Sequence, residues 1–227
     1  MSATTASAGL GRAVGFCEAP IGKKVVMAVS GVILFGFVAG HMTGNLLIFL
    51  GPERINDYAR FLRASPALLW GARLVLLAAV AAHVTASVQL ALLKRAARPI
   101  GYARYAPVQA DYASRTMMWS GPILLAFVVY HLLHFTFGTA HPSFRELDVY
   151  ANVVAGFRVV PVSLVYIVAM LLLGLHLYHG AWSMFQSMGV GHPRWTPALK
   201  RFAAAAAAIL AAGNISIPIA VLSGLVE

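Results

Sequence analysis

Five long apolar stretches set the organisation of this chain. Each is long enough to cross the hydrocarbon core of a membrane, which takes roughly 20 helical residues. The stretches cover residues 25–50, 68–93, 117–138, 160–187 and 202–225. Because they take up more than half of the chain and leave only short connections, we predict a single all-α domain over residues 1–227. This domain would be an integral membrane bundle of five transmembrane helices.

The composition agrees with a membrane location. Hydrophobic residues make up 60% of the chain and charged residues 11%, less than half of the charged fraction of about 25% that is usual in soluble domains. The first twenty residues lack the apolar core of a secretory signal peptide, so we expect a cytoplasmic lead-in and no cleaved leader. Cys17 is the only cysteine, which excludes an intramolecular disulfide and an iron–sulfur cluster held by cysteines of this chain alone.

The placement of the basic residues predicts the topology. With the N-terminus in the cytoplasm, the inner segments carry eleven Lys and Arg residues and the outer segments six. The inner set is Arg12, Lys23, Lys24, Lys94, Arg95, Arg98, Arg104, Arg115, Arg194, Lys200 and Arg201, and the outer set is Arg54, Arg60, Arg63, Arg73, Arg145 and Arg158. By the positive-inside rule the N-terminus is cytoplasmic, and five helices then put the C-terminus outside. The inner charges either only fix this topology or also form a docking face for cytoplasmic partner subunits.

Prolines mark the ends of several predicted spans. Pro122 and Pro161 fall in the first turns of the third and fourth spans, where proline costs little. Pro193 and Pro197 are expected to break the chain before the fifth span. That span also contains Asn214 and Pro218, which predicts a kink near its middle.

Three glycines recur at four-residue spacing in the first span. Gly36, Gly40 and Gly44 therefore share one helix face. One interpretation is a stripe of small residues that lets a neighbouring helix approach closely. The other is that a flat, bulky cofactor lies against this face and leaves no room for side chains.

The positions of the histidines carry most of the chemical information. Six of the eight lie inside the predicted spans: His41, His83, His131, His134, His176 and His179. An ionisable ring in hydrocarbon is costly unless it has a partner, so such residues are candidates for a functional site. One histidine could simply bond a neighbouring helix, but six on four helices are difficult to explain in that way.

The depths of four histidines sort them into two pairs. Consecutive helices alternate in direction and rise ~1.5 Å per residue, which puts His83 and His176 ~16 Å from the inner boundary and His41 and His131 ~20–25 Å from it. Each pair takes its members from two different helices. Two imidazoles that face each other across a bundle provide the axial ligands of a b-type haem, provided that each is neutral and its other ring nitrogen is hydrogen-bonded.

Depth alone does not decide between neighbouring histidines. His131 and His134 are three residues apart, as are His176 and His179, so the members of each set share a helix face. In each set, one ring could ligate iron while the other binds a propionate, a quinone or a backbone carbonyl.

Other kinds of site are not indicated. Gly9, Gly11 and Gly15 lack the preceding strand of a nucleotide-binding fingerprint. We find no nucleophile–base pair and no paired carboxylates. A histidine-containing transporter without haem is the alternative from another functional class, but the sequence has no carboxylate or inverted-repeat signature for it.

Three segments resemble a known family. The stretch SGVILFGFVAGHMTGNLLIFLGP (30–52) resembles the first helix of the cytochrome b subunit of succinate dehydrogenases and fumarate reductases, in its single-chain, five-helix, di-haem form. VYHLLHFTFG (129–138) resembles its third helix, and HLYHGAWSMFQSMG (176–189) its fourth helix and exit turn. The sequence around His83, AAHVTAS, is only weakly similar. The resemblance extends over nearly the whole chain.

The resemblance implies a set of iron ligands and two roles nearby. It implies that His41 and His131 ligate an outer haem and that His83 and His176 ligate an inner haem, the same pairing as the depths give. His134 and His179 then become candidates for contacts around the cofactors, or are packing residues. For an inner quinone site the weak candidates are Lys24 and Ser30, and for an outer one Asn45, Tyr58 and His134.

The resemblance also implies partners and a location. The chain would be a multi-pass subunit of the cytoplasmic membrane in a respiratory-chain complex that belongs to the tricarboxylic acid cycle. A flavoprotein subunit with FAD would carry out the dicarboxylate chemistry, an iron–sulfur subunit would dock on the inner face, and a quinone, menaquinone in our prediction, would react in the membrane. We expect membrane lipid as a further partner and no nucleic acid. The alternative within this class is a di-haem cytochrome b of another dehydrogenase, such as a nitrate reductase or hydrogenase.

One position departs from part of the family. Some fumarate reductases of this type have a glutamate just before the fourth-helix ligand, and it is implicated in proton movement. Leu175 occupies that position here. The sequence therefore does not support that proton path.

Overall fold

The computed structural model describes residues 15, 18–97 and 112–227, and the regular secondary structure of these residues is entirely helical. Five of these helices are long and apolar enough to cross a membrane, which confirms the predicted bundle. They are α2 (Pro20–Asn45), which continues as the 3₁₀ helix η1 (Leu46–Leu50), α4 (Pro66–Ala96), α5 (Tyr112–Phe135), α7 (Val160–Ser187) and α8 (Thr196–Leu222). The predictions for Gly9, Gly11, Arg12, Cys17, Arg98 and Arg104 concern residues outside the described ranges.

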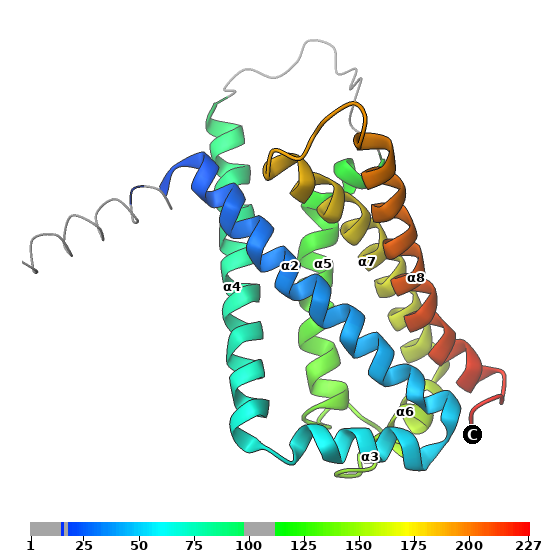
Figure 1. Ribbon diagram of the computed structural model, residues 1–227. Helices are drawn as coiled ribbons and strands as arrows, with labels where there is room; N and C mark the ends of the chain where they lie inside the picture. The colour runs from blue at the N-terminus through cyan, green and yellow to red at the C-terminus, as the bar shows by residue number, and fades with distance from the viewer. Residues whose placement is uncertain (1–14, 16–17, 98–111) are drawn as a thin grey trace, which may run out of the picture.

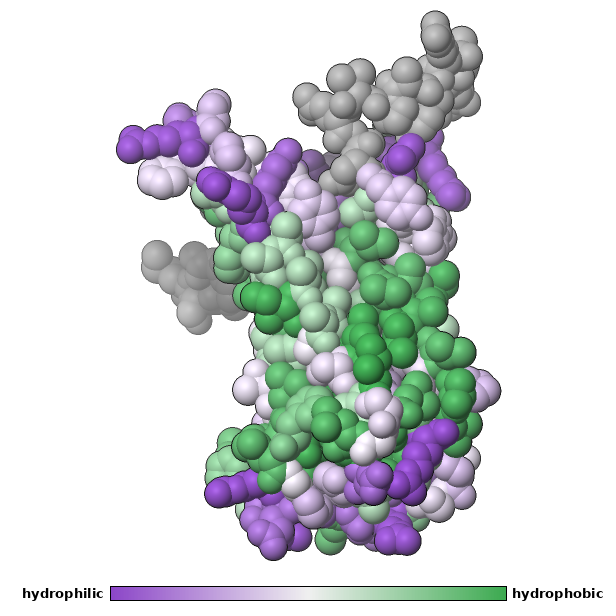
Figure 2. All heavy atoms as spheres, turned by 90° about the vertical axis from the view of Figure 1, so that its right-hand side faces the viewer, coloured by the Kyte–Doolittle hydropathy of each residue, from purple (hydrophilic) through white to green (hydrophobic). Residues whose placement is uncertain are grey.

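The surface of the bundle has the distribution of polarity that a membrane requires. Figure 2 shows an apolar belt between two ends where hydrophilic side chains gather. Large apolar side chains within the belt face outward, for example Leu77 at 68% exposure and Ile209 at 63%. In water such exposure would be costly, whereas against lipid it is the expected arrangement.

Two short helices at one end of the bundle were not predicted. Helix α3 (Pro52–Arg63) lies crosswise between α2 and α4, and α6 (Val149–Phe157) precedes α7 (Figure 1). Proline at the start of α3 fits the first turn of a helix, and the Asp148 side chain caps α6 by accepting a hydrogen bond from the Ala151 N–H. We call this part of the bundle the α3/α6 end. The opposite end is the one where α2 begins and α4 ends.

The helices extend further than the apolar stretches at several ends. Helix α5 begins at Tyr112, so Pro122 lies in its interior and not in its first turns. Helix α8 begins at Thr196, and Pro197 lies in its first turn and does not end a loop before it. Hydropathy marks the part of a helix that contacts lipid, whereas polar residues such as Arg115 continue the helix beyond it.

The closest helix packing falls into two groups, and α2 also packs directly against α7 and α8. Helix α2 packs closely against α4, and α7 packs against both α5 and α8. At the α3/α6 end, apolar side chains from η1, α3, α6, α7 and α8 form a buried cluster that includes Ile48, Ile55, Phe157 and Tyr166. The Ser163 hydroxyl donates a hydrogen bond of 2.6 Å to the Phe157 carbonyl and ties α6 to α7. This cluster fixes the end of α7 from which the candidate site is built.

Candidate functional site

Four of the six histidines inside the spans meet as two couples. The rings of His41 on α2 and His131 on α5 have centroids 5.8 Å apart, and those of His83 on α4 and His176 on α7 are 6.2 Å apart. We call these the His41 couple and the His83 couple. Each couple joins the α2/α4 pair of helices to the α5/α7 pair.

The couples lie at different levels along the bundle. His41 and His131 are each four residues before the end of their helix at the α3/α6 end, at Asn45 and Phe135. His83 and His176 are thirteen and eleven residues before the ends of α4 and α7 at the opposite end. The sequence predicted this separation from depth.

The ring spacing fits one metal ion between the members of each couple. A metal–imidazole bond is about 2.0–2.1 Å long and the ring centre lies roughly 1.1 Å from its nitrogens, so two imidazoles on opposite sides of one ion have centroids about 6.3 Å apart. The observed 5.8 and 6.2 Å are close to this value. The ring planes are rotated by 86° and 55°, which is compatible because two planes that share one axis can take any angle about it.

His83 is held in place by the neighbouring helix. The Ser30 hydroxyl lies 3.2 Å from His83 Nδ1 and donates its own proton to the Val26 carbonyl at 2.7 Å. The hydroxyl also lies 3.1 Å from the Met27 carbonyl. When its single proton goes to either carbonyl, Ser30 can only accept from His83, which puts the ring proton on Nδ1 and leaves Nε2 as the free donor of an electron pair. Gly31 lies against the same ring, and a Cβ there would be 3.6 Å from His83 Cε1.

His131 contacts a tyrosine hydroxyl from another helix. Its Nδ1 lies 3.3 Å from the Tyr166 hydroxyl on α7. Phe127 and Phe135 flank the ring with centroids at 6.0 and 5.9 Å. Both couples thus contain one histidine whose Nδ1 is next to a hydroxyl group from a different helix.

His134 lies in a more enclosed position than His131. It is 0% exposed, its Nδ1 lies 3.0 Å from the same Tyr166 hydroxyl, and its ring stacks on Tyr130 and His141. By contrast, His41, His83, His131 and His176 all keep exposed surface. A ligand must present a nitrogen to its cofactor, so the geometry favours His131 over His134 at the His41 couple.

The two histidines of α7 differ in what the structure shows of their contacts. His176 is half-buried and contacts His83, while its buried Nδ1 has no hydrogen-bond partner among the described residues. An orphaned ring nitrogen of this kind needs a polar partner that a bound group or a water could supply. His179 is also half-buried, three residues further along α7, and its role stays a prediction.

The glycine face of α2 divides into two parts. A Cβ at Gly36 or Gly40 would meet nothing within 4 Å, so these glycines do not serve close helix packing. Gly44 is packed against the Tyr58 ring, and a Cβ there would overlap with it. The open part next to His41 agrees with a flat group lying on the helix, and the closed part agrees with the packing interpretation.

A network of hydrogen bonds next to His134 connects α6 to the loop that precedes it. Asn152, buried in α6, receives the Arg145 N–H at 2.8 Å and donates to the Arg145 carbonyl at 2.7 Å. His141 accepts from the Ser143 N–H and donates from Nε2 to the Asn152 carbonyl at 2.8 Å. His141 therefore has a defined tautomer and a fixed position against His134.

Tyr166, His141 and Asn152 were not identified from the sequence. For Tyr166 the signal was a hydroxyl-bearing ring in the apolar fourth span, although ten residues put it about 80° away from His176 around the helix. His141 and Asn152 carry no such signal, since their contacts depend on how the loop before α6 folds.

The quinone candidates are scattered in the structure. Lys24 is exposed at the opposite end, and Ser30 is committed to His83. Tyr58 covers Gly44, and Asn45 is half-buried where α2 passes into η1. These residues line neither the hollow around α6 nor the groove between α5 and α7.

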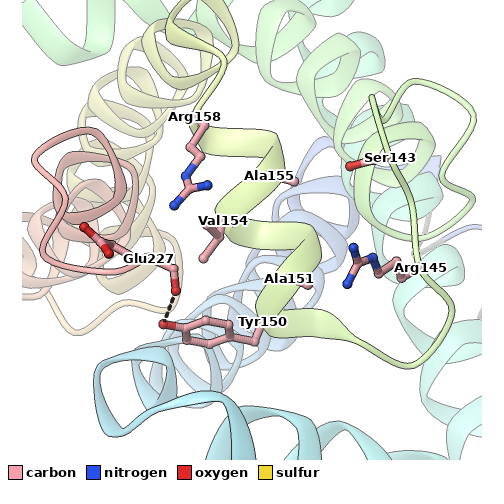
Figure 3. A pocket seen from close by; sticks show the side chains of 8 residues that line it. All are labelled: Ser143, Arg145, Tyr150, Ala151, Val154, Ala155, Arg158 and Glu227. Carbon is pink, nitrogen blue, oxygen red and sulfur yellow. Dashed lines mark hydrogen bonds between the residues drawn. The ribbon is translucent and has the colours of Figure 1, made fainter.

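Two hollows open on the surface of the bundle. Figure 3 shows one of about 250 Å³ around α6, with Arg145 and Arg158 on its rim and the Tyr150 hydroxyl bonded to the Glu227 carbonyl at 2.9 Å. The other is an open, apolar groove of about 470 Å³ between α5 and α7, lined by residues that include Phe127 and Tyr130. No histidine lines either hollow, but Phe127 of the groove also flanks the His131 ring.

Within the described ranges no three His, Cys, Asp or Glu side chains converge on one point. Each couple brings two imidazoles together, and two is the number of protein ligands that a haem iron takes in its axial positions.

Comparisons with protein-family models, with curated proteins and with solved structures found no match for this chain. The function proposed next therefore depends on the resemblance of the three sequence segments and on the geometry of the two couples.

Proposed function

We propose that this chain is the membrane-anchor cytochrome b subunit of a succinate:quinone oxidoreductase, of the succinate dehydrogenase or fumarate reductase type. The observation that carries the proposal is the pair of histidine couples, with ring centroids 5.8 and 6.2 Å apart at two levels of an apolar bundle. Two cofactors stacked in this way would connect the two sides of the membrane for electrons.

The residues of this chain would hold and orient two b-type haems. His41 and His131 would ligate one, and His83 and His176 the other. Bound haem supplies one-electron transfer at iron, with a potential set by the axial ligands and their hydrogen bonds. Ser30, whose hydroxyl lies 3.2 Å from His83 Nδ1, would hold the ring in the tautomer that offers Nε2, and Gly36 and Gly40 leave open space along α2.

The proposed partners are a flavoprotein with FAD and an iron–sulfur subunit on the cytoplasmic side. Support comes from basic residues at the opposite end of the bundle: Lys23, Lys24, Lys94, Arg95, Arg115, Arg194, Lys200 and Arg201. Their excess favours a cytoplasmic location for that end. Electrons would pass between the iron–sulfur subunit and a membrane quinone, for which we propose menaquinone, while the dicarboxylate reacts on the flavoprotein.

The test is isolation of the intact complex from the cytoplasmic membrane. We expect the chain to co-purify with a flavoprotein and an iron–sulfur protein, and the complex to oxidise succinate with a menaquinone analogue as acceptor. A complex that contains haem but carries the subunits of another dehydrogenase would refute the succinate assignment while leaving the two haem sites in place. A purified chain without haem would refute both.

A further inference from the structure

The Tyr166 hydroxyl lies between two histidines and contacts both. It is 3.3 Å from His131 Nδ1 and 3.0 Å from His134 Nδ1. Tyr166 is buried on α7, while both histidines belong to α5. Its ring is fixed by Phe127 and Phe157, with centroids at 5.0 and 4.9 Å.

A phenol has a single proton, so the two hydrogen bonds cannot have the same direction. The hydroxyl can donate to one histidine nitrogen and accept from the other. If His131 binds a metal through Nε2, its proton must sit on Nδ1 and point to the tyrosine oxygen. The hydroxyl proton then goes to His134 Nδ1, which puts the ring proton of His134 on its buried Nε2, for which the described residues provide no hydrogen-bond partner.

We propose that Tyr166 is the positioning residue of the His41 couple, which fixes His131 as the ligand and His134 as its hydrogen-bonded neighbour. This inference rests on the proposed function, because it concerns the ligation of a haem by His131. An acceptor on the outer nitrogen of a ligating imidazole makes the ring a stronger electron donor. Tyr166 thus lowers the midpoint potential of the haem held by the His41 couple.

The hydroxyl groups of Ser30 and Tyr166 then have different roles. The Ser30 hydroxyl lies within hydrogen-bond distance of the Val26 and Met27 carbonyls, and a proton donated to either of them ends the chain of hydrogen bonds from His83. Tyr166 passes its proton to a second imidazole. A hydrogen bond donated by a group makes that group a better acceptor, so His134 strengthens the bond between Tyr166 and His131.

The test uses the full chain with its haems and compares Tyr166→Phe with Tyr130→Phe. Tyr130 is a matched control, because it stacks on His134 and lies 6.0 Å from Tyr166 by ring centroid but has no hydrogen bond to either histidine. Redox titration followed by optical spectra gives the potential of each haem. The low-spin electron paramagnetic resonance signal of each haem reports its axial ligands.

We expect Tyr166→Phe to raise the potential of one haem and leave the other unchanged. Loss of a hydrogen bond to a ligand should change the ratio of reduced to oxidised haem about three- to ten-fold at a fixed potential. This corresponds to about 30–60 mV for one electron. The resonance signal of the same haem should shift, and Tyr130→Phe should change neither haem.

A second variant keeps the proposal testable if Tyr166→Phe does not fold. His134→Phe retains a ring of similar size and removes the acceptor of the Tyr166 proton. It should raise the potential of the same haem by a smaller amount. Two haems with unchanged potentials and signals in the variants that fold would overturn the role of Tyr166 while leaving the proposed function intact. A wild-type chain without a b-type spectrum would instead refute the proposed function.

Discussion

Replacing Gly156 with alanine tests how tightly α6 packs on His134 and His141. A Cβ at this position would lie 2.9 Å from His134 Cε1, 3.1 Å from His134 Nε2 and 3.2 Å from His141 Nε2. Neither ring can move freely, since His134 contacts Tyr166 and His141 is bonded to the Asn152 carbonyl. The added methyl group must therefore displace α6 or both rings.

The magnitude follows from two opposing effects. Overpacking of a rigid site costs about 1–3 kcal/mol, whereas alanine in place of glycine in a helix gains at most about 1 kcal/mol. The net loss of about 1–2 kcal/mol should lower the unfolding midpoint of a chain of this size by about 2–8 °C. Circular dichroism of the purified full chain in detergent, recorded during heating, measures this midpoint.

Gly71→Ala is the control for this measurement. Gly71 is also inside a helix, the membrane-spanning α4, and a Cβ there would meet nothing within 4 Å. Its replacement should leave the midpoint unchanged or raise it by up to about 4 °C. The reasoning is refuted if the Gly156→Ala protein melts at the same temperature as the Gly71→Ala protein or above it.

Three further predictions concern the histidine couples, the glycine face of α2 and the hydrogen bonds of Asn152. Alanine in place of His83 or His176 should remove one haem from the reduced spectrum, and alanine in place of His41 or His131 should remove the other. Equal loss of both haems from every variant would argue against the pairing. Gly40→Leu should reduce the haem content because the leucine side chain enters the open space on α2, whereas Gly71→Leu should leave the haem content unchanged. Full haem content in both variants would rule out a cofactor against the Gly36 and Gly40 face of α2. Asn152→Ala leaves a backbone N–H and a carbonyl without partners at a cost of about 1–3 kcal/mol, so we expect a melting midpoint about 2–12 °C lower. An unchanged midpoint would show that water replaces these bonds.

The membrane-spanning part of the fold was predictable because the thickness of the bilayer sets the length of each apolar stretch. The fourth span was predicted at its observed bounds, Val160–Ser187. The short helices were not predicted because their stability depends on tertiary contacts. Ile55 of α3 and Phe157 of α6 are buried in the same apolar cluster. Asp148 is a helix-capping residue type, and it was the one local signal for α6.

The levels of the histidines were predictable, but their surroundings were not. Helix direction and rise per residue placed the two couples at separate depths, and the structure brings their rings together. The difference between His131 and His134 depends on the rotation of α5 about its axis, which is set by packing against α7. The division of the glycine face likewise depends on where Tyr58 packs. Ligation of iron by these residues stays a prediction.

The most direct measurement is a dithionite-reduced minus oxidised spectrum of the purified full chain, with the haem content determined per chain. Our account predicts an α band of the b type and two haems, one for each place where imidazoles from separate helices face each other. A chain that folds and inserts into the membrane but shows no such band would contradict the account.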